Sequence, residues 1–378
     1  MSIVGCKVDM KILLLCWRDT SHPQGGGSER YLERVGAYLS RQGHEVLLRT
    51  ASYQGAQRHE ERDGMKISRG GGRMSVYVQA GVLMVLGRMR LGQMKDVDVV
   101  VDTQNGIPFF ARVFAGKPTV LLTHHCHKEQ WPVAGPVLSR IGWFLESRIA
   151  PRVYRNSQYV TVSQPSAEEL VQLGVDRDRV SIIRNGVDPA LEVQAAPAAG
   201  IRLVTLSRLV PHKQIEHAMD VVAALAPSHD VHLDVVGSGW WEDRLRAYAL
   251  ELGVARRVHF HGQVSELRKH EILARAALHL MPSRKEGWGL AVIEAGQHSV
   301  PTVGYRSSAG LRDSVHDGVT GVLVDSKAEL IDATTDLIRH AARRTELGRA
   351  AQARSAEFSW ESTGAEFAAL LERVAGRS

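Results

Sequence analysis

Residues 282–295 read PSRKEGWGLAVIEA and directly follow the apolar run Leu278–Met281. The run predicts a buried strand and the spacing after Gly289 predicts a helix, so the stretch is a strand, a loop and a helix in succession. Gly287 and Gly289 allow a ligand to approach the backbone closely. The N–H groups of Gly289 and Leu290, at the start of the helix, would face an anion such as a phosphate.

Two carboxylates flank these glycines, at Glu286 on the loop and at Glu294 about a turn and a half into the helix. We expect Glu286 at the mouth of a binding site. Glu294 is expected to accept hydrogen bonds from a diol such as a ribose. The alternative interpretation is a solvated loop followed by an ordinary amphipathic helix.

The same alternation of apolar runs and amphipathic stretches extends over almost the whole chain, which predicts parallel sheets covered by helices on both faces. Strands are expected at 11–17, 45–49, 97–102, 119–123 and 159–163, then at 201–207, 231–236, 257–261, 278–281 and 301–304. The predicted fold class is α/β, with two Rossmann-like domains facing each other across a cleft. Ligands are expected outside the carboxyl ends of the strands.

The Ala/Pro-rich stretch 189–200 interrupts this alternation and predicts a linker. The 378 residues leave room for two domains. We therefore place an N-terminal domain at 1–188, with 1–9 as an extension, and a C-terminal domain at 201–355. Residues 356–378 are predicted to form a final helix that packs back on the N-terminal domain.

Composition narrows the class of protein. No apolar run is long enough to cross a membrane, no secretory signal is recognised, and three cysteines cannot form an even set of disulfides. We therefore expect a cytoplasmic protein with reduced thiols. The net charge of +6 favours an anionic partner. The sequence has no Lys/Arg block with interleaved aromatic residues, so we do not expect it to bind nucleic acid.

A second cluster, SRLVPHK at 207–213, lies between a predicted strand and a predicted helix. Arg208 and Lys213 are placed to converge on a diphosphate, with each charge-assisted contact worth roughly 1.5–3 kcal/mol. Two cations and a helix N-terminus can offset the charge of a pyrophosphate without a metal. Two solvated surface cations are the alternative.

The N-terminal half has a Gly-rich loop, QGGGS at 24–28, before a helix expected at 28–41 with Ser28 as its N-cap. Such a loop suits anion binding, although it does not match the dinucleotide fingerprint G-x-G-x-x-G. The segment THHCHK at 123–128 suggests a metal, but ligands this crowded cannot all point inward from one short loop. We expect no metal site. Asn105 and Gly106 follow another predicted strand and are expected to line an acceptor site.

Together these segments resemble the family 4 glycosyltransferases of the GT-B fold. The resemblance also includes IRNGVD at 183–188, VVGSG at 235–239 and VHFHGQV at 258–264, and it covers essentially the whole chain. It implies transfer of a hexosyl group from a UDP- or GDP-sugar to an acceptor hydroxyl, with retention of anomeric configuration. It further implies an acceptor-binding N-terminal domain, a nucleotide-sugar-binding C-terminal domain, and no cofactor or metal.

The resemblance also implies roles by position. Arg208 and Lys213 would hold the donor diphosphate and stabilise the leaving group, whereas Glu286 and Glu294 match the two glutamates of the E-x7-E motif. His124 fits a histidine near the donor sugar, and His125, also an acceptor-site candidate, is the alternative one residue along. The catalytic set is His124, Glu286, Arg208 and Lys213. The donor-binding set is Gly26, Gly27, Arg208, Lys213, Gln263, Val264, Glu286, Gly287, Trp288, Gly289, Leu290 and Glu294, with Gln263 and Val264 at the edge of the base pocket.

The acceptor is left open as a glycan, a lipid or a small metabolite, and so is the oligomeric state. Residues 81–95 and 138–155 mix apolar side chains with arginines, as do helices that lie on anionic bilayers. Two interpretations stay open: association with the inner face of the membrane, and ordinary helices with a basic outer face. Two other functions fit the same architecture: a nucleotide-sugar epimerase and a catalytically silent nucleotide-sugar-binding protein.

Overall fold

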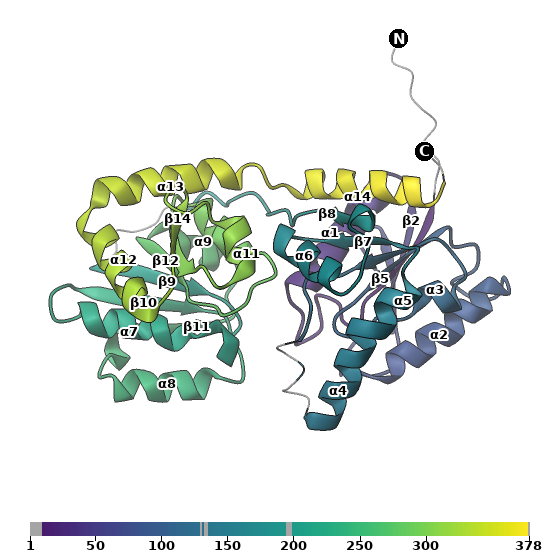
Figure 1. Ribbon diagram of the computed structural model, residues 1–378, viewed down its shortest axis with the longest axis horizontal. Coiled ribbons are helices and arrows are strands. Elements are labelled where there is room, and N and C mark those ends of the chain that lie inside the picture. The colour runs from purple at the N-terminus through teal and green to yellow at the C-terminus, as the bar shows by residue number, and fades with distance from the viewer. Residues whose placement is uncertain (1–9, 129–130, 132–134, 194–198, 377–378) are drawn as a thin grey trace, which may run out of the picture. The chain divides into compact units, whose positions relative to one another are not determined.

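The computed structural model describes residues 10–128, 131, 135–193 and 199–376. The predicted extension at 1–9 and part of the predicted linker, 194–198, lie outside these residues. Internal contacts divide the chain into two compact units. Unit 1 comprises Met1–Gly186 together with Trp360–Ser378, and unit 2 comprises Val187–Ser359. Each unit is a sheet with helices on its faces (Figure 1).

The described part of unit 1 contains an eight-stranded sheet in the order β3-β4-β2-β1-β5-β6-β7-β8. The pairs are parallel except for the β3–β4 hairpin at one edge. The strands are β1 (Lys11–Leu15), β2 (Glu45–Thr50), β3 (His59–Arg62), β4 (Met65–Arg69), β5 (Val99–Thr103), β6 (Thr119–Leu122), β7 (Gln158–Thr161) and β8 (Val180–Ile182). Buried aliphatic side chains in β1, β2 and β5 form its core.

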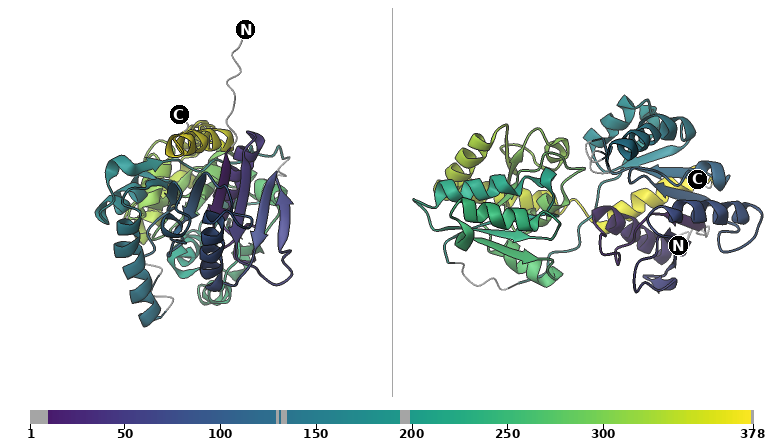
Figure 2. Two further views of the ribbon diagram at one scale, coloured as in Figure 1. Left: turned by 90° about the vertical axis from the view of Figure 1, so that its right-hand side faces the viewer. Right: turned by 90° about the horizontal axis from the view of Figure 1, so that it is seen from below.

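Helices cover both faces of this sheet. They are α1 (Gly27–Arg41), α2 (Ser75–Arg88), α3 (Ala111–Phe114), α4 (Pro136–Phe144), α5 (Ala150–Val153), α6 (Gln164–Gln172) and α14 (Trp360–Val374), with a π-helical segment at Leu145–Ile149. The final helix α14 lies against α1 (Figure 2). Gly364 leaves room there for the ring of Tyr38. Thr363 Oγ1 donates to the carbonyl of Arg184 at 2.9 Å, which fixes the start of α14 on this unit.

The described part of unit 2 contains a six-stranded parallel sheet in the order β11-β10-β9-β12-β13-β14. Its strands are β9 (Ile201–Leu206), β10 (Val231–Val236), β11 (Val258–Gly262), β12 (Leu278–Met281), β13 (Thr302–Tyr305) and β14 (Gly321–Val324). Its helices are α7 (Ile215–Leu225), α8 (Glu242–Glu251), α9 (Glu266–Ala274), α10 (Leu290–Gly296), α11 (Ala309–Ser314), α12 (Lys327–Arg339) and α13 (Ala341–Ser355).

The structure corrects one predicted detail of α1. Its N-cap is Gly26 rather than Ser28, because the Glu29 carboxylate reaches back to accept from the Gly26 N–H at 2.8 Å. Ser28 instead lies inside the first turn, where its hydroxyl donates to the same carboxylate at 2.9 Å. The helix therefore starts earlier than the sequence signal indicated.

Candidate functional site

The candidate donor site of unit 2 lies where β9, β11 and β12 reach their carboxyl ends. Because these strands are parallel, the loops that follow them emerge at the same edge of the sheet. The loop after β9 carries Arg208 and Lys213, the loop after β12 carries Glu286, and Gln263 follows β11. Residues predicted from three separate parts of the sequence thus share one edge.

Lys213 and Glu286 are in direct contact. Lys213 Nζ lies 2.5 Å from Glu286 Oε1, and the two side chains are only 12% and 10% exposed. Lys213 ends a short 3-10 turn, Pro211–Lys213, and Gln214 then adopts a left-handed conformation before α7 begins. The pair places a cation and a carboxylate together at the mouth of the predicted site, and a phosphate oxygen could compete with Glu286 for the ammonium group.

Arg208 is exposed at the same edge, on a segment that glycines hold in place. A Cβ at Gly237 would lie 2.0 Å from the Ser207 carbonyl oxygen, and one at Gly239 would lie 2.1 Å from that of Leu209. The loop after β10 therefore needs glycine at both positions. Leu209 N–H donates to the Ser238 carbonyl at 3.0 Å, which fixes the backbone on which Arg208 stands.

The glycines of the segment 282–295 shape the start of α10. Gly289 is its N-cap with φ +90° and ψ +58°, a left-handed conformation that strains other residues, and Leu290 is the first helical residue. Beside them the Trp288 ring is 3% exposed and packs edge-on against Phe358. Gly310 passes so close to Gly287 and to the Glu286 carbonyl that a Cβ there would lie 2.4 Å from that oxygen. The backbone around Glu286 is thus tightly held.

Glu294 has a partner that the sequence did not indicate. Lys269 on α9 lies 2.7 Å from Glu294 Oε1 and 2.7 Å from Glu266 Oε2, and its side chain is 9% exposed. Burial alone would lower the pKa of Lys269, but the two carboxylates outweigh it and the pKa is raised. Lys269 therefore fixes the Glu294 carboxylate. In the sequence, Lys269 is only a lysine three residues after a helical glutamate, and this pattern is too common to predict its contact with Glu294.

The remaining predicted donor residues of unit 2 differ in burial. Gln263 is exposed immediately after β11, and half-buried Val264 packs on the apolar cluster that includes Val204. His212, next to Lys213, adds no charge at neutral pH, because burial and then the Lys213 ammonium lower its pKa to about 4. The charge of this edge comes from the cations and carboxylates themselves.

In unit 1, His124 follows β6 and is buried against α1. Its ring meets that of Tyr31 edge-on, with centroids 5.2 Å apart, and its Nε2 has no partner among the described residues. Burial lowers the pKa of His124 to about 4, although the Glu29 carboxylate opposes the shift. The imidazole is therefore neutral at pH 7. His125 is half-buried, with its ring 4.6 Å from that of His127.

The loop after β5 carries the predicted acceptor residues. Asn105 Nδ2 lies 3.7 Å from the Cys16 sulfur, and Gly106 has φ +94° beneath the Trp131 ring. Trp131 Nε1 donates to Glu146 at 2.6 Å, and this fully buried carboxylate lies on the π-helical segment. Glu146 thus anchors the ring that covers Gly106.

Gly26 and Gly27 lie at the N-terminus of α1. The Gly26 N–H already donates a hydrogen bond to the Glu29 carboxylate of the same helix. A Cβ added at Gly27 would meet no atom of the described residues within 4 Å, so the backbone there is open to a neighbour.

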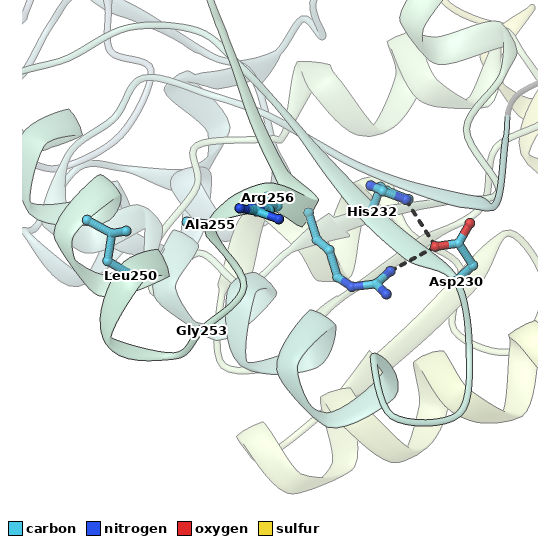
Figure 3. A pocket seen from close by; sticks show the side chains of 7 residues that line it. Asp230, His232, Leu250, Gly253, Ala255 and Arg256 are labelled. Atoms are coloured by element: carbon cyan, nitrogen blue, oxygen red, sulfur yellow. Dashed lines mark hydrogen bonds and ion pairs between the residues drawn. The ribbon is translucent and has the colours of Figure 1, made fainter.

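Unit 2 also has a surface hollow (Figure 3). It is lined by Asp230, His232, Leu250, Gly253, Ala255, Arg256 and Arg257. Asp230, His232 and Arg257 lie at the amino ends of β10 and β11, whereas the candidate donor site lies at the carboxyl ends of the strands. The described residues contain no group of three or more His, Cys, Asp or Glu side chains that could hold a metal ion. Asp98 accepts from the Lys11 N–H at 2.8 Å and so joins the starts of two strands.

Two family models match the chain in succession. The model described as "Glycosyltransferase Family 4" matches residues 25–191, and that described as "Glycosyl transferases group 1" matches residues 191–354. The chain is 30% identical over 383 residues to the GDP-mannose-dependent alpha-(1-6)-phosphatidylinositol monomannoside mannosyltransferase of Mycolicibacterium smegmatis, covering 92% of this chain and 95% of the relative. The protein of that name in Mycobacterium tuberculosis (strain ATCC 25618 / H37Rv) is 29% identical over 381 residues, with the same coverage.

Solved structures agree on the fold. Sucrose-phosphate synthase from Thermosynechococcus elongatus is similar with a TM-score of 0.80 and 18% identity, over 98% of this chain and 100% of that one. WaaG, a glycosyltransferase involved in lipopolysaccharide biosynthesis, has a TM-score of 0.73 and 18% identity, over 95% and 99%. The predicted α/β class with two Rossmann-like domains is confirmed, and so is the resemblance. The chain belongs to the family 4 glycosyltransferases of the GT-B fold.

Proposed function

We propose that the protein transfers a hexosyl group from a nucleotide diphosphate sugar to an acceptor hydroxyl, with retention of configuration and without a metal. The contact between Lys213 and Glu286 carries the proposal, because it sets a largely buried cation beside the N-terminus of α10 at the carboxyl edge of the sheet. GDP-mannose is the favoured donor, since two relatives that match most of the chain are named GDP-mannose-dependent. A UDP-sugar is the second candidate, because a protein of similar fold was solved with UDP-glucose.

In this proposal the residues of unit 2 act on the diphosphate. Arg208 and Lys213 bind the phosphate oxygens, and the backbone N–H groups of Gly289 and Leu290 add the positive end of α10. As the bond to the sugar breaks, negative charge grows on the leaving diphosphate, and these fixed donors stabilise it. Glu286 accepts hydrogen bonds from the sugar hydroxyls, and Glu294, held by Lys269, accepts from the ribose.

We assign the acceptor to unit 1, with Asn105, Gly106 and His125 as candidate contacts. His124 is proposed to contact the donor sugar as a neutral imidazole, because its pKa of about 4 leaves it uncharged at pH 7. Gly26 and Gly27 are proposed to lie against the donor. The candidate acceptors are a glycan, a lipid and a small metabolite. We favour a lipid, because the names of the two relatives include phosphatidylinositol monomannoside.

A membrane surface is the proposed setting for a lipid acceptor. Helix α2 and its flanks expose the apolar side chains Met74, Val78, Val82, Val85 and Met89, and α4 exposes Val137, Leu138, Ile141 and Phe144. Arginines accompany both helices, so each offers apolar contact and attraction to anionic headgroups. In the described part of the chain, none of the helices has the length and apolar character needed to cross a bilayer.

A donor-consumption assay tests this function. The full chain would be incubated with GDP-mannose, UDP-glucose or UDP-galactose, with and without EDTA, and release of nucleoside diphosphate measured with and without a bacterial lipid extract. Acceptor-dependent release from one donor that persists in EDTA is expected. Conversion of the donor to an isomer without acceptor would favour an epimerase, and neither release nor conversion would favour a silent binding protein; the comparisons support neither alternative.

Sedimentation with vesicles tests the membrane proposal separately. We expect the protein to pellet with phosphatidylglycerol vesicles at low salt and not with phosphatidylcholine alone. Val78→Ser/Val82→Ser, which removes two exposed methyl-rich side chains from α2, should weaken pelleting. No binding to anionic vesicles at low salt would overturn the proposal.

A further inference from the structure

Tyr31, in the second turn of α1, lies behind the histidine that we place beside the donor sugar. Its side chain is 0% exposed, and its ring meets the imidazole of His124 edge-on, with centroids 5.2 Å apart. Aromatic rings favour this arrangement. A hydrogen bond also joins His124 to the backbone of Ser28, three residues earlier on the same helix. Helix α1 therefore holds this imidazole at two points about one turn apart.

The imidazole of His124 has one nitrogen left to use. His124 is 7% exposed, and its buried Nε2 has no hydrogen-bond partner among the described residues. Buried polar atoms are normally hydrogen-bonded, so an exception of this kind points to a ligand or a water. Under the proposed function, the missing partner is a hydroxyl of the donor sugar. Because a hydrogen bond weakens steeply when it is misaligned, the orientation of the ring decides how well Nε2 meets that hydroxyl.

Tyr31 also contacts both connections between the two units. The chain leaves unit 1 after Gly186 and returns to it at Trp360. The Tyr31 hydroxyl donates to the carbonyl of Ile183 at 3.1 Å, three residues before Gly186. The Tyr31 ring meets that of Trp360 with centroids 6.2 Å apart. One buried side chain thus joins His124 to the outgoing and to the returning connection.

The returning connection also reaches the donor loop of unit 2. Phe358, two residues before Trp360, packs edge-on against Trp288 in the loop after β12, with ring centroids 4.7 Å apart. The two connections are paired with each other as well, through a bridge between Val187 and Ser359. This short connection therefore has one end on the donor loop and the other on the ring that lies behind the imidazole.

We propose that Tyr31 is a positioning residue of the transfer reaction, which sets the orientation of His124 from the two connections between the units. The proposal rests on the proposed function for the contact between His124 and the donor sugar. Tyr31 touches no substrate and acts only through the imidazole. Trp360 and the carbonyl of Ile183 hold Tyr31 in turn, so a change at either connection alters the orientation of the histidine.

Transfer rates test whether Tyr31 acts through His124. Nucleoside diphosphate release from the active donor would be measured on the full chain. Tyr31→Leu removes the ring from the imidazole, and we expect kcat to fall about tenfold or more. The affinity for the nucleoside diphosphate should stay within about twofold, because we assign the nucleotide to unit 2. Tyr31→Phe keeps the ring and should retain at least about a third of the rate.

A double-mutant cycle separates positioning from general packing. In the background of His124→Ala, Tyr31→Leu should cause no further loss of the residual transfer rate. A residue that acts through the imidazole has nothing to position once that imidazole is gone. A residue with a merely structural role would instead reduce the rate by the same factor in both backgrounds.

Phe367 on α14 provides the matched control. It is 0% exposed, and its ring centroid lies 6.2 Å from that of Tyr31, but it has no ring contact with His124 among the described residues. Phe367→Leu should lower the unfolding midpoint as Tyr31→Leu does, because each removes part of a buried ring. Its kcat should stay within about twofold of the wild type. An equal loss of kcat in both variants would overturn the positioning role.

Titration of the His124 ring by NMR gives a readout that needs no turnover. Burial lowers the pKa of His124 to about 4; the Glu29 carboxylate opposes this shift, and the neighbouring His127 adds to it. Tyr31→Leu should let water reach the ring and so raise this pKa toward 6.5. Tyr31→Phe and Phe367→Leu should leave it where it is.

A further variant covers a failure of Tyr31→Leu to fold. Trp360→Leu removes the ring next to Tyr31 and leaves the contact between Tyr31 and His124 in place. It should lower kcat about threefold or more, and have no effect in the background of His124→Ala.

The outcomes separate this proposal from the function on which it rests. Equal losses in both backgrounds of the cycle, or a His124 pKa that Tyr31→Leu leaves unchanged, would overturn the role of Tyr31. A wild type that releases nucleoside diphosphate from none of the donors would overturn the proposed function. The titration would then decide by itself whether Tyr31 sets the environment of His124.

Discussion

Replacing Lys213 with methionine removes the ammonium group that lies 2.5 Å from Glu286 Oε1 and leaves a carboxylate only 10% exposed without its partner. Breaking a fully buried pair costs about 3–5 kcal/mol, and an exposed pair contributes about 1 kcal/mol or less. At this burial we expect Lys213→Met to lower the free energy of unfolding by about 1–3 kcal/mol. Adding Glu286→Gln should restore more than half of that loss, because no unpaired charge remains.

Activity should not recover with stability. Each single variant and the double variant should lose at least about a hundredfold in transfer rate, because the cation that stabilises the leaving diphosphate is gone or the sugar contact is lost. Urea unfolding followed by tryptophan fluorescence gives the stabilities, and a double-mutant cycle gives the coupling between the two residues. Additive stability losses, or a double variant that still transfers sugar, would refute the reasoning.

Single residues give three further predictions. Gly289→Ala should lower stability by about 1–2 kcal/mol and weaken nucleoside diphosphate binding, because alanine resists φ +90° at the start of α10; calorimetric titration with GDP measures the second effect. Lys269→Met should lower the affinity for a nucleoside diphosphate more than for pyrophosphate, since it frees Glu294, and competition titrations compare the two ligands. Burial lowers the pKa of His279 in the folded protein from 6.5 to about 4. Between these two values only the unfolded chain binds the proton, so the free energy of unfolding falls as the pH drops from 6.5 toward 4, by up to about 1.4 kcal/mol per pH unit. His279→Gln should reduce this pH dependence, as measured by urea unfolding.

The central strands were predictable because they are buried on both faces and read as continuous apolar runs. β9, β10 and β12 lie within the predicted ranges or coincide with them. The hairpin β3–β4 was not predicted, because its edge strand HEER is polar and carries no apolar alternation. β8, at three residues, is too short to give a periodic signal, and β14 (GVLV) was not predicted although it is as short and as apolar as β12.

The candidate site was predictable only where chemistry and spacing coincide in one segment. Glycines between two glutamates, after a strand, identified the loop that carries Glu286. The partners that come from elsewhere in the fold carry no local signal. Lys269 is an ordinary helical lysine in the sequence. Its role depends on the Glu294 carboxylate that the fold brings within its reach.

Binding of nucleoside diphosphates tests the central claim most directly. The full chain and Lys213→Met would be titrated with GDP, UDP, ADP and dTDP in the presence and absence of EDTA, by calorimetry. We expect one nucleotide, with GDP favoured, to bind the wild type equally well in EDTA, and to bind Lys213→Met at least about tenfold more weakly. Absence of binding by all four nucleotides, or binding that Lys213→Met leaves unchanged, would contradict the assignment of the donor site to unit 2.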